Sequence, residues 1–201
     1  SYPMALSAIS FFLMQSTDVL FISAYDTFDS VAYYSIAVKL ASVTALALIS
    51  VNIVIAPKIA SIYNDKNFYE LKLILKKATR INVVISLPII IVLLCFSEYI
   101  LSTFGSNYVL AKSALWVLLF AQFFNSVTGP SALYLNMTGR QKKLNVILLI
   151  SLLINIVLNI ILVPAYGMLG AAISTTASFI ISKIFASALV LYLDNVKTFI
   201  S

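Results

Sequence analysis

The fold is decided by residues 136–178, which read NMTGRQKKLNVILLISLLINIVLNIILVPAYGMLGAAISTTAS. The stretch opens on a short basic turn, and no residue from 144 to 182 is charged. One Pro-x-x-Gly turn, at residues 164–167, interrupts this uncharged run. A helix needs about 20 apolar residues to cross a bilayer, and Pro with Gly marks a turn. The pattern therefore predicts two membrane-spanning helices placed back to back.

The composition places the whole chain in a membrane. Of its 201 residues 62% are hydrophobic and only 10% are charged, and the mean hydropathy is +1.05. A soluble domain carries about 25% charged residues, so this chain has too few polar groups to cover a water-exposed surface. The formal net charge of +6 then reports membrane orientation, not nucleic-acid binding. The lack of histidine excludes His-based metal sites and His-dependent catalysis.

Six apolar runs follow one another along the chain. Each reaches the roughly 20 residues that cover about 30 Å of hydrocarbon. They predict one all-α domain over residues 1–201, a bundle of six transmembrane helices. The predicted helices are residues 4–24, 31–56, 81–104, 108–137, 144–163 and 169–193.

The loops alternate between basic and non-basic, which sets the predicted orientation. Lys and Arg gather in residues 64–80 and 138–143, and Lys197 lies in the tail. The remaining loops contain no basic residue. Loops rich in Lys and Arg face the cytoplasm, so both ends of the chain are predicted to be cytoplasmic. The chain enters its first apolar run almost at once, and we therefore interpret the chain as a piece of a longer protein.

Residues 67–80 predict a basic amphipathic helix on the cytoplasmic membrane face. Phe68, Leu71 and Leu75 recur three and four residues apart, and Lys72 and Lys76 fall between them. One interpretation is a simple topological anchor. The other is contact with anionic lipid headgroups.

Three charged residues lie within the predicted spans, where a charge is costly and usually faces a partner or a cavity. Asp18 is roughly 9 Å and Lys39 roughly 12 Å from the loop that joins their helices, at 1.5 Å per residue. Lys183 lies near the middle of the last span. An Asp18–Lys39 ion pair could simply lock two helices together. Alternatively, Lys39 and Lys183 line a cationic cavity for an anionic substrate, and Asp18 binds a coupling proton or Na⁺.

Uncharged polar residues also interrupt the apolar runs. Gln15, Asn125, Asn155 and Asn159 are predicted either to line a polar cavity or to form hydrogen bonds between helices. Asn155 and Asn159 are four residues apart, so they share one helix face. No nucleophile motif, phosphate-binding loop or metal-ligand cluster is present, so no catalytic residue and no metal site are predicted.

Several prolines, and one glycine beside a proline, fall within or next to the predicted spans. Pro57, Pro88 and the pair Gly129 and Pro130 are predicted to break helices in or near the middle of the membrane. At Pro57 the alternative is that the helix continues to Tyr63. Such breaks free backbone carbonyls and provide hinges, which transporters need.

Five stretches, taken together and in this order, carry a family resemblance. They are QSTDVLFIS at 15–23, VAYYSIAVKLAS at 31–42, APKIASIY at 56–63, AQFFNSVTGPSALYLNMTGRQKK at 121–143 and LINIVLNIILVPAYGMLGAAISTTAS at 153–178. The set resembles the polysaccharide flippases of the Wzx type. These belong to the superfamily that also holds the MATE multidrug exporters and the peptidoglycan-precursor flippases. The resemblance is to the second half of such a protein, from its seventh to its twelfth helix.

The resemblance implies one lobe of a MATE-like, two-lobed transporter in a bacterial or archaeal cytoplasmic membrane. Such a protein moves an undecaprenyl-pyrophosphate-linked oligosaccharide to the outer leaflet by alternating access, for surface polysaccharides such as O-antigen. The implied partners are this lipid-linked oligosaccharide, the lipid bilayer and a missing N-terminal six-helix lobe, with no nucleic acid. Asp18 and Lys39 carry over as members of recurring patterns, whereas Lys183 is nominated by its depth alone.

Other functions remain open at this point. A related exporter would carry drugs or peptidoglycan precursors, and a membrane scaffold would carry nothing. An enzyme such as a glycosyltransferase usually needs a sizeable extramembrane loop with acids or His, whereas the largest loop here, residues 64–80, is mostly basic. The sequence therefore predicts a transport protein that is not an enzyme, with no cofactor beyond a coupling proton or Na⁺.

Overall fold

The structure is a computed structural model that describes residues 13, 16–196 and 198–199. Within that part the chain is almost entirely helical and contains no strand. In lipid every backbone polar group needs a partner within the protein, and a helix provides one within a single segment. A helix over residues 16–25 is followed by α2 (Phe28–Val43), α3 (Ala45–Asn64), α4 (Phe68–Cys95), α5 (Ser97–Ser102), the 3₁₀-helix η1 (Ser106–Ala111), α6 (Lys112–Thr128), α7 (Ser131–Met137) and α8 (Gln141–Asp194).

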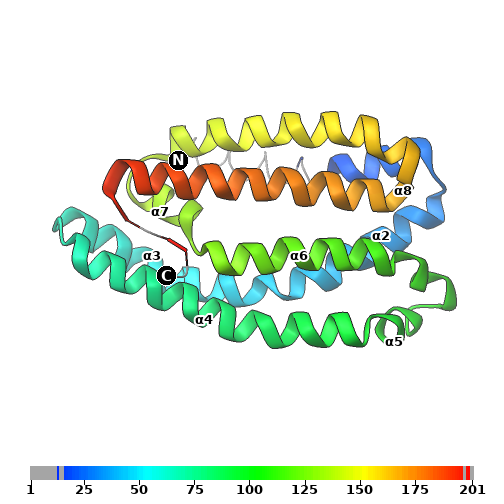
Figure 1. The fold of residues 1–201 in the computed structure, drawn as a ribbon, viewed down its shortest axis with the longest axis horizontal. Coiled ribbons are helices and arrows are strands. Elements are labelled where there is room, and N and C mark those ends of the chain that lie inside the picture. Colours follow the sequence, from blue (N-terminus) through cyan, green and yellow to red (C-terminus); the bar gives the residue numbers. More distant parts are fainter. Residues whose placement is uncertain (1–12, 14–15, 197, 200–201) are drawn as a thin grey trace.

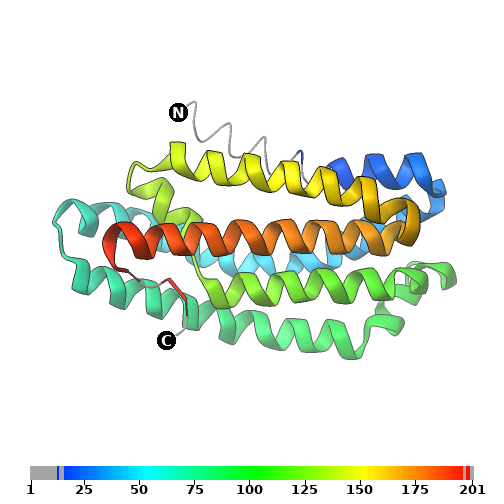
Figure 2. The same cartoon turned by 45° about the horizontal axis from the view of Figure 1, so that its top comes forward.

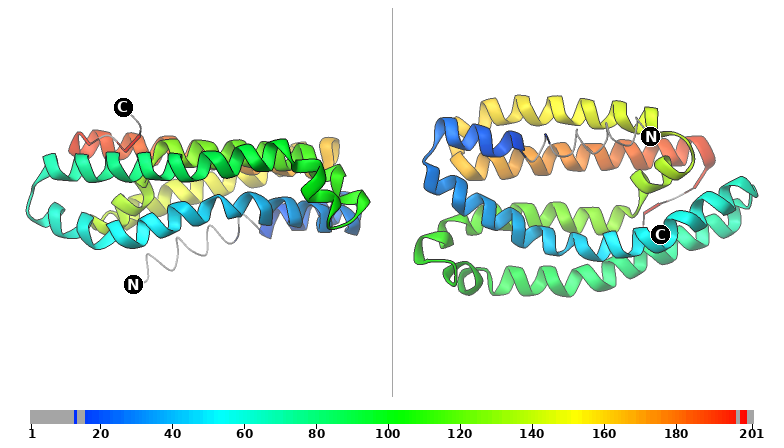
Figure 3. Two further views of the ribbon diagram at one scale, coloured as in Figure 1. Left: turned by 90° about the horizontal axis from the view of Figure 1, so that it is seen from below. Right: turned by 180° about the vertical axis from the view of Figure 1, so that it is seen from behind.

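The long helices run roughly parallel or antiparallel to one another. Helices α8, α6 and α4 lie side by side in a row (Figure 1 and Figure 2). Helices α2 and α3 cover one side of this row (Figure 3). Polar caps start two of these helices: Thr27 accepts a hydrogen bond from the Ser30 amide at 3.3 Å before α2, and Asn67 accepts one from the Glu70 amide at 3.2 Å before α4.

Helix α8 is a hairpin folded at Gly167. This residue has φ 54° and ψ −134°, a backbone conformation that glycine adopts far more readily than other residues. A Cβ at this position would lie 2.7 Å from the carboxylate of Asp26. The two halves run side by side (Figure 1), and Asn155 Nδ2 donates to Thr175 Oγ1 between them at 3.0 Å. The position at which α8 folds back, Gly167, therefore lies within the turn predicted at residues 164–167.

The predicted span over residues 31–56 is divided in the structure. Helix α2 ends at Val43, and the helical parts on either side of the break meet at 48°. The Thr44 hydroxyl donates to the Ala41 carbonyl at 2.7 Å. A hydroxyl that bonds a carbonyl of the preceding turn competes with the helix backbone and bends the helix, a local effect that hydropathy does not report.

Residues 67–80 do not form a separate helix. They are the first half of α4, which continues without a break to Cys95. The predicted apolar face is buried at Leu71 and Leu75, whereas Phe68 at the start of the helix is exposed. The apolar face of the basic segment continues into the span, and no residue between them ends the helix.

The predicted break at Pro88 is wrong, because α4 continues through it. At Pro57 the alternative is confirmed, because α3 continues through this residue to Asn64. A proline removes one backbone hydrogen bond, and packed neighbouring helices keep the remaining turns in place. The break predicted at Gly129 and Pro130 is present, since α6 ends at Thr128 and α7 begins directly afterwards. That any of these positions acts as a hinge stays a prediction.

Three of the described helical segments are long and apolar enough to cross a membrane. They are Phe68–Cys95, Ser106–Thr128 and Gln141–Asp194. The bent pair of Phe28–Val43 and Leu48–Asn64 makes a fourth if it is counted as one span. The count of six spans stays a prediction.

The apolar core consists of two clusters, one at each end of the bundle. We call the end of the bundle where α8 folds back, and where Asp26 lies against Gly167, the Gly167 end. We call the opposite end, where α8 begins, the Arg140 end. The Gly167-end cluster includes Ile22, Tyr34, Leu101, Leu115, Leu119 and Ala171. The Arg140-end cluster includes Ile59, Leu71, Leu75, Tyr134, Leu135 and Val190. In a bilayer such clusters stabilise the fold through close packing, because lipid tails are as apolar as the side chains.

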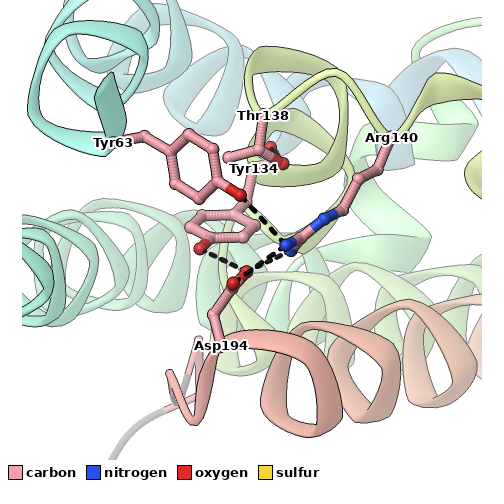
Figure 4. A network of polar contacts seen from close by, with 5 residues as sticks. All are labelled: Tyr63, Tyr134, Thr138, Arg140 and Asp194. Carbon is pink, nitrogen blue, oxygen red and sulfur yellow. Dashed lines mark hydrogen bonds and ion pairs between the residues drawn. The ribbon is translucent and has the colours of Figure 1, made fainter. Parts of the chain in front are cut away.

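A polar network joins three helices at the Arg140 end (Figure 4). Asp194, the last residue of α8, accepts hydrogen bonds from the Arg140 guanidinium and, at 2.7 Å, from the Tyr134 hydroxyl. Arg140 also donates to the hydroxyl of Tyr63 on α3 at 3.0 Å. The hydrogen bonds with Asp194 raise the pKa of Arg140 above its ordinary value. Arg140, which the sequence assigned only to a basic loop, thus ties the two ends of the α8 hairpin to α3.

Candidate functional site

A layer of polar side chains separates the two apolar clusters. In each long helical segment these residues fall between the part that packs at the Gly167 end and the part that packs at the Arg140 end. Polar groups at membrane depth are costly and usually serve a pathway or a binding site. The layer includes Thr79, Asn82 and Ser86 on α4, Asn125, Ser126 and Thr128 on α6, and Ser151, Asn155, Asn159, Ser174, Thr176, Ser178, Ser182 and Lys183 on α8.

Asp18 is the acidic centre of this polar region, and its side chain is 2% exposed. One carboxylate oxygen, Oδ2, accepts hydrogen bonds from the Tyr34 hydroxyl at 2.6 Å and from the Thr175 hydroxyl. The other, Oδ1, accepts from Asn159 Nδ2 at 3.0 Å and from Asn155 Nδ2 at 3.5 Å. Four protein donors thus take the place of water around a carboxylate in the interior of the bundle.

Two turns between antiparallel helical segments, at Asp26 and at Gly167, bring these groups to the same depth. Asp18 and Tyr34 lie eight residues before and after the turn at Asp26. Asn159 and Thr175 lie eight residues before and after the turn of α8. Eight residues of helix correspond to about 12 Å. All four side chains therefore meet at one level, about 12 Å from the Gly167 end.

Lys39 does not pair with Asp18, so the predicted ion pair between them is wrong. The ion pairs formed within the described residues involve neither side chain. Tyr34 takes the place beside the carboxylate, and Lys39, five residues later, is turned by about 140° around the helix. Lys39 is exposed and lines an open cavity of about 460 Å³ between residues 16–25 and α2. We call this the Lys39 cavity.

A smaller cavity, of about 80 Å³, reaches Asp18. It is lined by Asp18, Tyr34, Gln122, Thr175 and Phe179, among others. Most of its lining is apolar, but Asp18, Tyr34, Gln122 and Thr175 provide polar partners, and a cavity of this volume has room for water. We call it the Asp18 cavity, and Tyr34 lines both it and the Lys39 cavity.

Lys183 lies in the interior of the second half of α8 and is 9% exposed. Its Nζ lies 5.6 Å from the centre of the Phe179 ring, within range of a cation–π contact. The described part of the chain forms no ion pair with it. Thr175, Phe179 and Lys183 are spaced four apart, so they share one face of the helix. This face leads from the Asp18 cavity to the buried ammonium group.

The MatE family profile matches residues 3–161, most of the chain. The chain belongs to the MatE family. A protein of Shigella flexneri named as an O-antigen transporter is 30% identical over 148 residues, which are 73% of this chain and 35% of that protein. A protein of Haloferax volcanii named as a low-salt glycan biosynthesis flippase is 26% identical over 183 residues, 89% of this chain and 38% of that protein. The chain thus spans little more than a third of the length of these MatE relatives.

A solved MatE-type structure has the same fold. It is described as the outward-facing conformation of a multidrug resistance MATE family transporter of the MOP superfamily. It matches with a TM-score of 0.79 at 19% sequence identity, over all of this chain and 45% of that chain. The predicted all-α, MATE-like membrane fold and the resemblance to this superfamily are confirmed. The MatE match and the apolar helices confirm the prediction of a multi-pass membrane protein. The names of the two relatives describe transport by those proteins.

The structure brings some of the predicted polar residues together and separates others. Asn155 and Asn159 both reach Asp18, as described above. Asn125 is buried elsewhere in the polar layer and donates from Nδ2 to Gln122 Oε1 at 3.4 Å. Gln15 lies outside the described residues. Lys183 lines neither of the two cavities described above, so neither of them holds Lys39 and Lys183 together.

Sequence reasoning missed Tyr34 and Thr175, the two hydroxyl partners of Asp18. A tyrosine and a threonine are ordinary residues in apolar helices, so composition does not mark them. Their distance from the turns does mark them. Each lies as far from its turn as Asp18 and Asn159 do on the other side.

Proposed function

We propose that this MatE chain is the C-terminal lobe of a flippase for an undecaprenyl-pyrophosphate-linked oligosaccharide. The full-length protein would move this lipid across the cytoplasmic membrane by alternating access, for surface polysaccharides such as O-antigen. One observation carries the proposal: Tyr34 and its neighbours on α2 separate the buried Asp18 site from the open Lys39 cavity. The names of the two relatives, an O-antigen transporter and a glycan flippase, support a cargo of this class.

The basic residues suit an anionic lipid headgroup. A pyrophosphate carries negative charge, and charge interactions strengthen where water is excluded. Lys39 is exposed in its cavity and free of any ion pair within the described residues. Lys183 holds a buried positive charge further along the interior. Lys39 would meet the headgroup first, and Lys183 would attract it once the lobes rearrange.

Asp18 suits a coupling cation. Its site gathers the carboxylate, the hydroxyls of Tyr34 and Thr175, and the amide side chains of Asn155 and Asn159. Oxygen-bearing groups of this kind fit either a proton or Na⁺. Both amide oxygens are buried without a hydrogen-bond partner among the described residues. The site therefore has acceptor capacity that a bound cation would use.

The second lobe would supply the opposite wall of the transport path. The chain spans 35% and 38% of the length of its two relatives. We propose an N-terminal six-helix lobe as its partner, with both ends of this segment in the cytoplasm as the loop charges predict. The two lobes would rock about the polar space between them, as in alternating access.

Replacing Lys39 and Lys183 together with alanine in the full-length protein should abolish surface polysaccharide while the protein is still inserted. The reason is that the anionic headgroup would lose both cations that attract it. The measurement is the amount of surface polysaccharide in cells that lack their own flippase, normalised to the transporter in the membrane.

The matched control is the double change Lys66→Ala and Lys77→Ala, which removes the same charge from exposed positions. It should retain normal polysaccharide. Normal polysaccharide in the Lys39 and Lys183 variant would contradict the assigned role of these lysines. A wild-type protein that restores drug efflux but no polysaccharide would instead favour the multidrug class.

A further inference from the structure

Helix α4 gathers positive charge on the half that packs at the Arg140 end. Its four bases are Lys72, Lys76, Lys77 and Arg80, and none of them forms an ion pair with another described residue. Three of them are exposed, and Lys76 is half-buried. The one acid of α4, Glu70, is six residues before Lys76, about 9 Å along the helix. The positive charge is therefore not balanced within the described part of the chain.

The outward side of α4 becomes apolar immediately after these bases. With 3.6 residues per turn, a sector of about 80° around the helix contains Lys76, Arg80, Val84 and Ile91. Val84 is 70% exposed and Ile91 is 50% exposed. Helix α4 forms one edge of the row of α8, α6 and α4 (Figure 2), which agrees with this exposure. The sector thus presents bases at one level and an open apolar strip below them.

The length of this sector fits one leaflet of a bilayer. Arg80 and Ile91 are eleven residues apart, about 16 Å along the helix. Half of the hydrocarbon of a bilayer is about 15 Å thick. If Arg80 lies at the level of the headgroups, an acyl chain along α4 passes Val84 and ends near Ile91. The bases and the apolar strip therefore have the spacing of a phosphate and its acyl chains.

The charge of the sector selects the kind of lipid. Lys76, Lys77 and Arg80 lie within five consecutive positions. A guanidinium can bond a phosphate through two parallel hydrogen bonds, and ammonium groups add charge. Basic segments at the end of a membrane-spanning helix attract anionic lipids. A simple topological anchor needs only bases near the membrane, whereas these bases stand directly above an open apolar strip.

We propose that the outward side of α4 is a binding site for one anionic phospholipid. The lipid belongs to the leaflet at the Arg140 end, which the loop charges predict to be the cytoplasmic one. Its phosphate lies at Lys76, Lys77 and Arg80, and its acyl chains lie along Val84 and Ile91. No residue of α4 lines the Asp18 cavity or the Lys39 cavity. The site is therefore separate from the proposed cargo site and does not depend on it.

Lipid titration of the purified full-length protein in detergent tests this site. Native mass spectrometry measures the dissociation constant of the first phosphatidylglycerol bound. The triple change Lys76→Gln, Lys77→Gln and Arg80→Gln should weaken this binding about 100-fold, because each base near the membrane surface contributes about fivefold. Binding of phosphatidylcholine, whose headgroup has no net charge, should be unchanged.

The matched control removes three exposed bases from the same end of the bundle. The changes are Lys66→Gln, Lys142→Gln and Lys143→Gln. These residues are divided between the turn before α4 and the start of α8, so they do not form one headgroup site. The control should keep phosphatidylglycerol affinity within about threefold, because separated charges are screened by salt.

The wild-type protein provides a second measurement that does not depend on how the variants fold. It should bind phosphatidylglycerol at least about tenfold more tightly than phosphatidylcholine. Inorganic phosphate at millimolar concentration should not displace the lipid, because free phosphate gains nothing from the apolar strip.

Three outcomes would overturn the inference. Equal losses in the two triple variants would mean that net charge at this end, and not the α4 sector, holds the lipid. Equal affinity of the wild-type protein for the two lipids would assign the bases to a water-soluble partner. Displacement by phosphate would identify a site for free anions. None of these results changes the cargo proposed for the Lys39 cavity.

Discussion

Replacing Asp18 with asparagine will abolish gradient-driven transport by the full-length protein and leave the amount of folded protein unchanged. Asparagine has nearly the same shape, and it keeps an oxygen that Tyr34 and Thr175 can bond. A neutral amide is also cheaper to bury than a carboxylate. It cannot, however, exchange a proton or balance the charge of Na⁺. The expected result is therefore a stable protein that no longer uses an ion gradient.

The measurement is transfer of a lipid-linked oligosaccharide in proteoliposomes with an imposed proton or Na⁺ gradient. Transfer by the Asp18→Asn protein should fall to the level of liposomes without protein. Asp29→Asn removes an exposed acid from the first turn of α2 and should leave transfer unchanged. Full gradient dependence in the Asp18→Asn protein would exclude Asp18 as the coupling group.

Replacing Gly129 with alanine will lower the free energy of unfolding by about 2–6 kcal/mol, through backbone strain and overpacking. Gly129 has φ 67° and ψ −164°, a conformation that is nearly restricted to glycine. A Cβ there would lie 2.3 Å from both the Thr198 carbonyl oxygen and the Thr79 hydroxyl. These two groups bond each other at 2.8 Å, so neither can move without losing a partner.

Thermal unfolding of the purified protein in detergent measures this loss. Gly139→Ala is the control, because Gly139 also has a positive φ, 76°, but a Cβ added to it would have no atom within 4 Å. It should cost only about 1–2 kcal/mol of backbone strain. Equal losses in the two variants would show that crowding at Gly129 does not matter.

The helices could be predicted from the sequence because membrane insertion leaves few alternatives. A long uncharged run has to be helical in lipid, and the turn in residues 164–167 could be placed by its proline and glycine. The ends of helices were harder. Hydropathy does not mark the bend at Thr44, where the hydroxyl bonds the Ala41 carbonyl, and it does not decide whether α3 ends at Pro57 or continues through it.

The candidate site was predicted in part. Asp18 could be found because a carboxylate in an apolar helix is costly to bury, and such a residue usually has a functional role. Its partners could not be found from charge, since hydroxyls and amides surround it and Lys39 does not. The rotation of α2 about its axis decides which of its side chains faces Asp18. This rotation is set by helix packing, which hydropathy does not report.

The polar layer between the apolar clusters is the feature that distinguishes this bundle from an inert one. An inert bundle gains stability from a continuous apolar interior, whereas this one buries Asp18 and Lys183, and neither forms an ion pair with another described residue. Buried charges of this kind lower stability unless they are compensated. Their presence is in keeping with a site that binds a cation at one place and an anion at another.

The position of the lipid headgroup can be measured by photo-crosslinking in the full-length protein. A photoreactive amino acid at Ser35, in the wall of the Lys39 cavity, should capture the lipid-linked oligosaccharide from native membranes. The same group at Ile53, which is 71% exposed on α3, should capture only bulk lipids. Equal capture of the oligosaccharide lipid at both positions, or none at Ser35, would contradict a flippase that receives its cargo at Lys39.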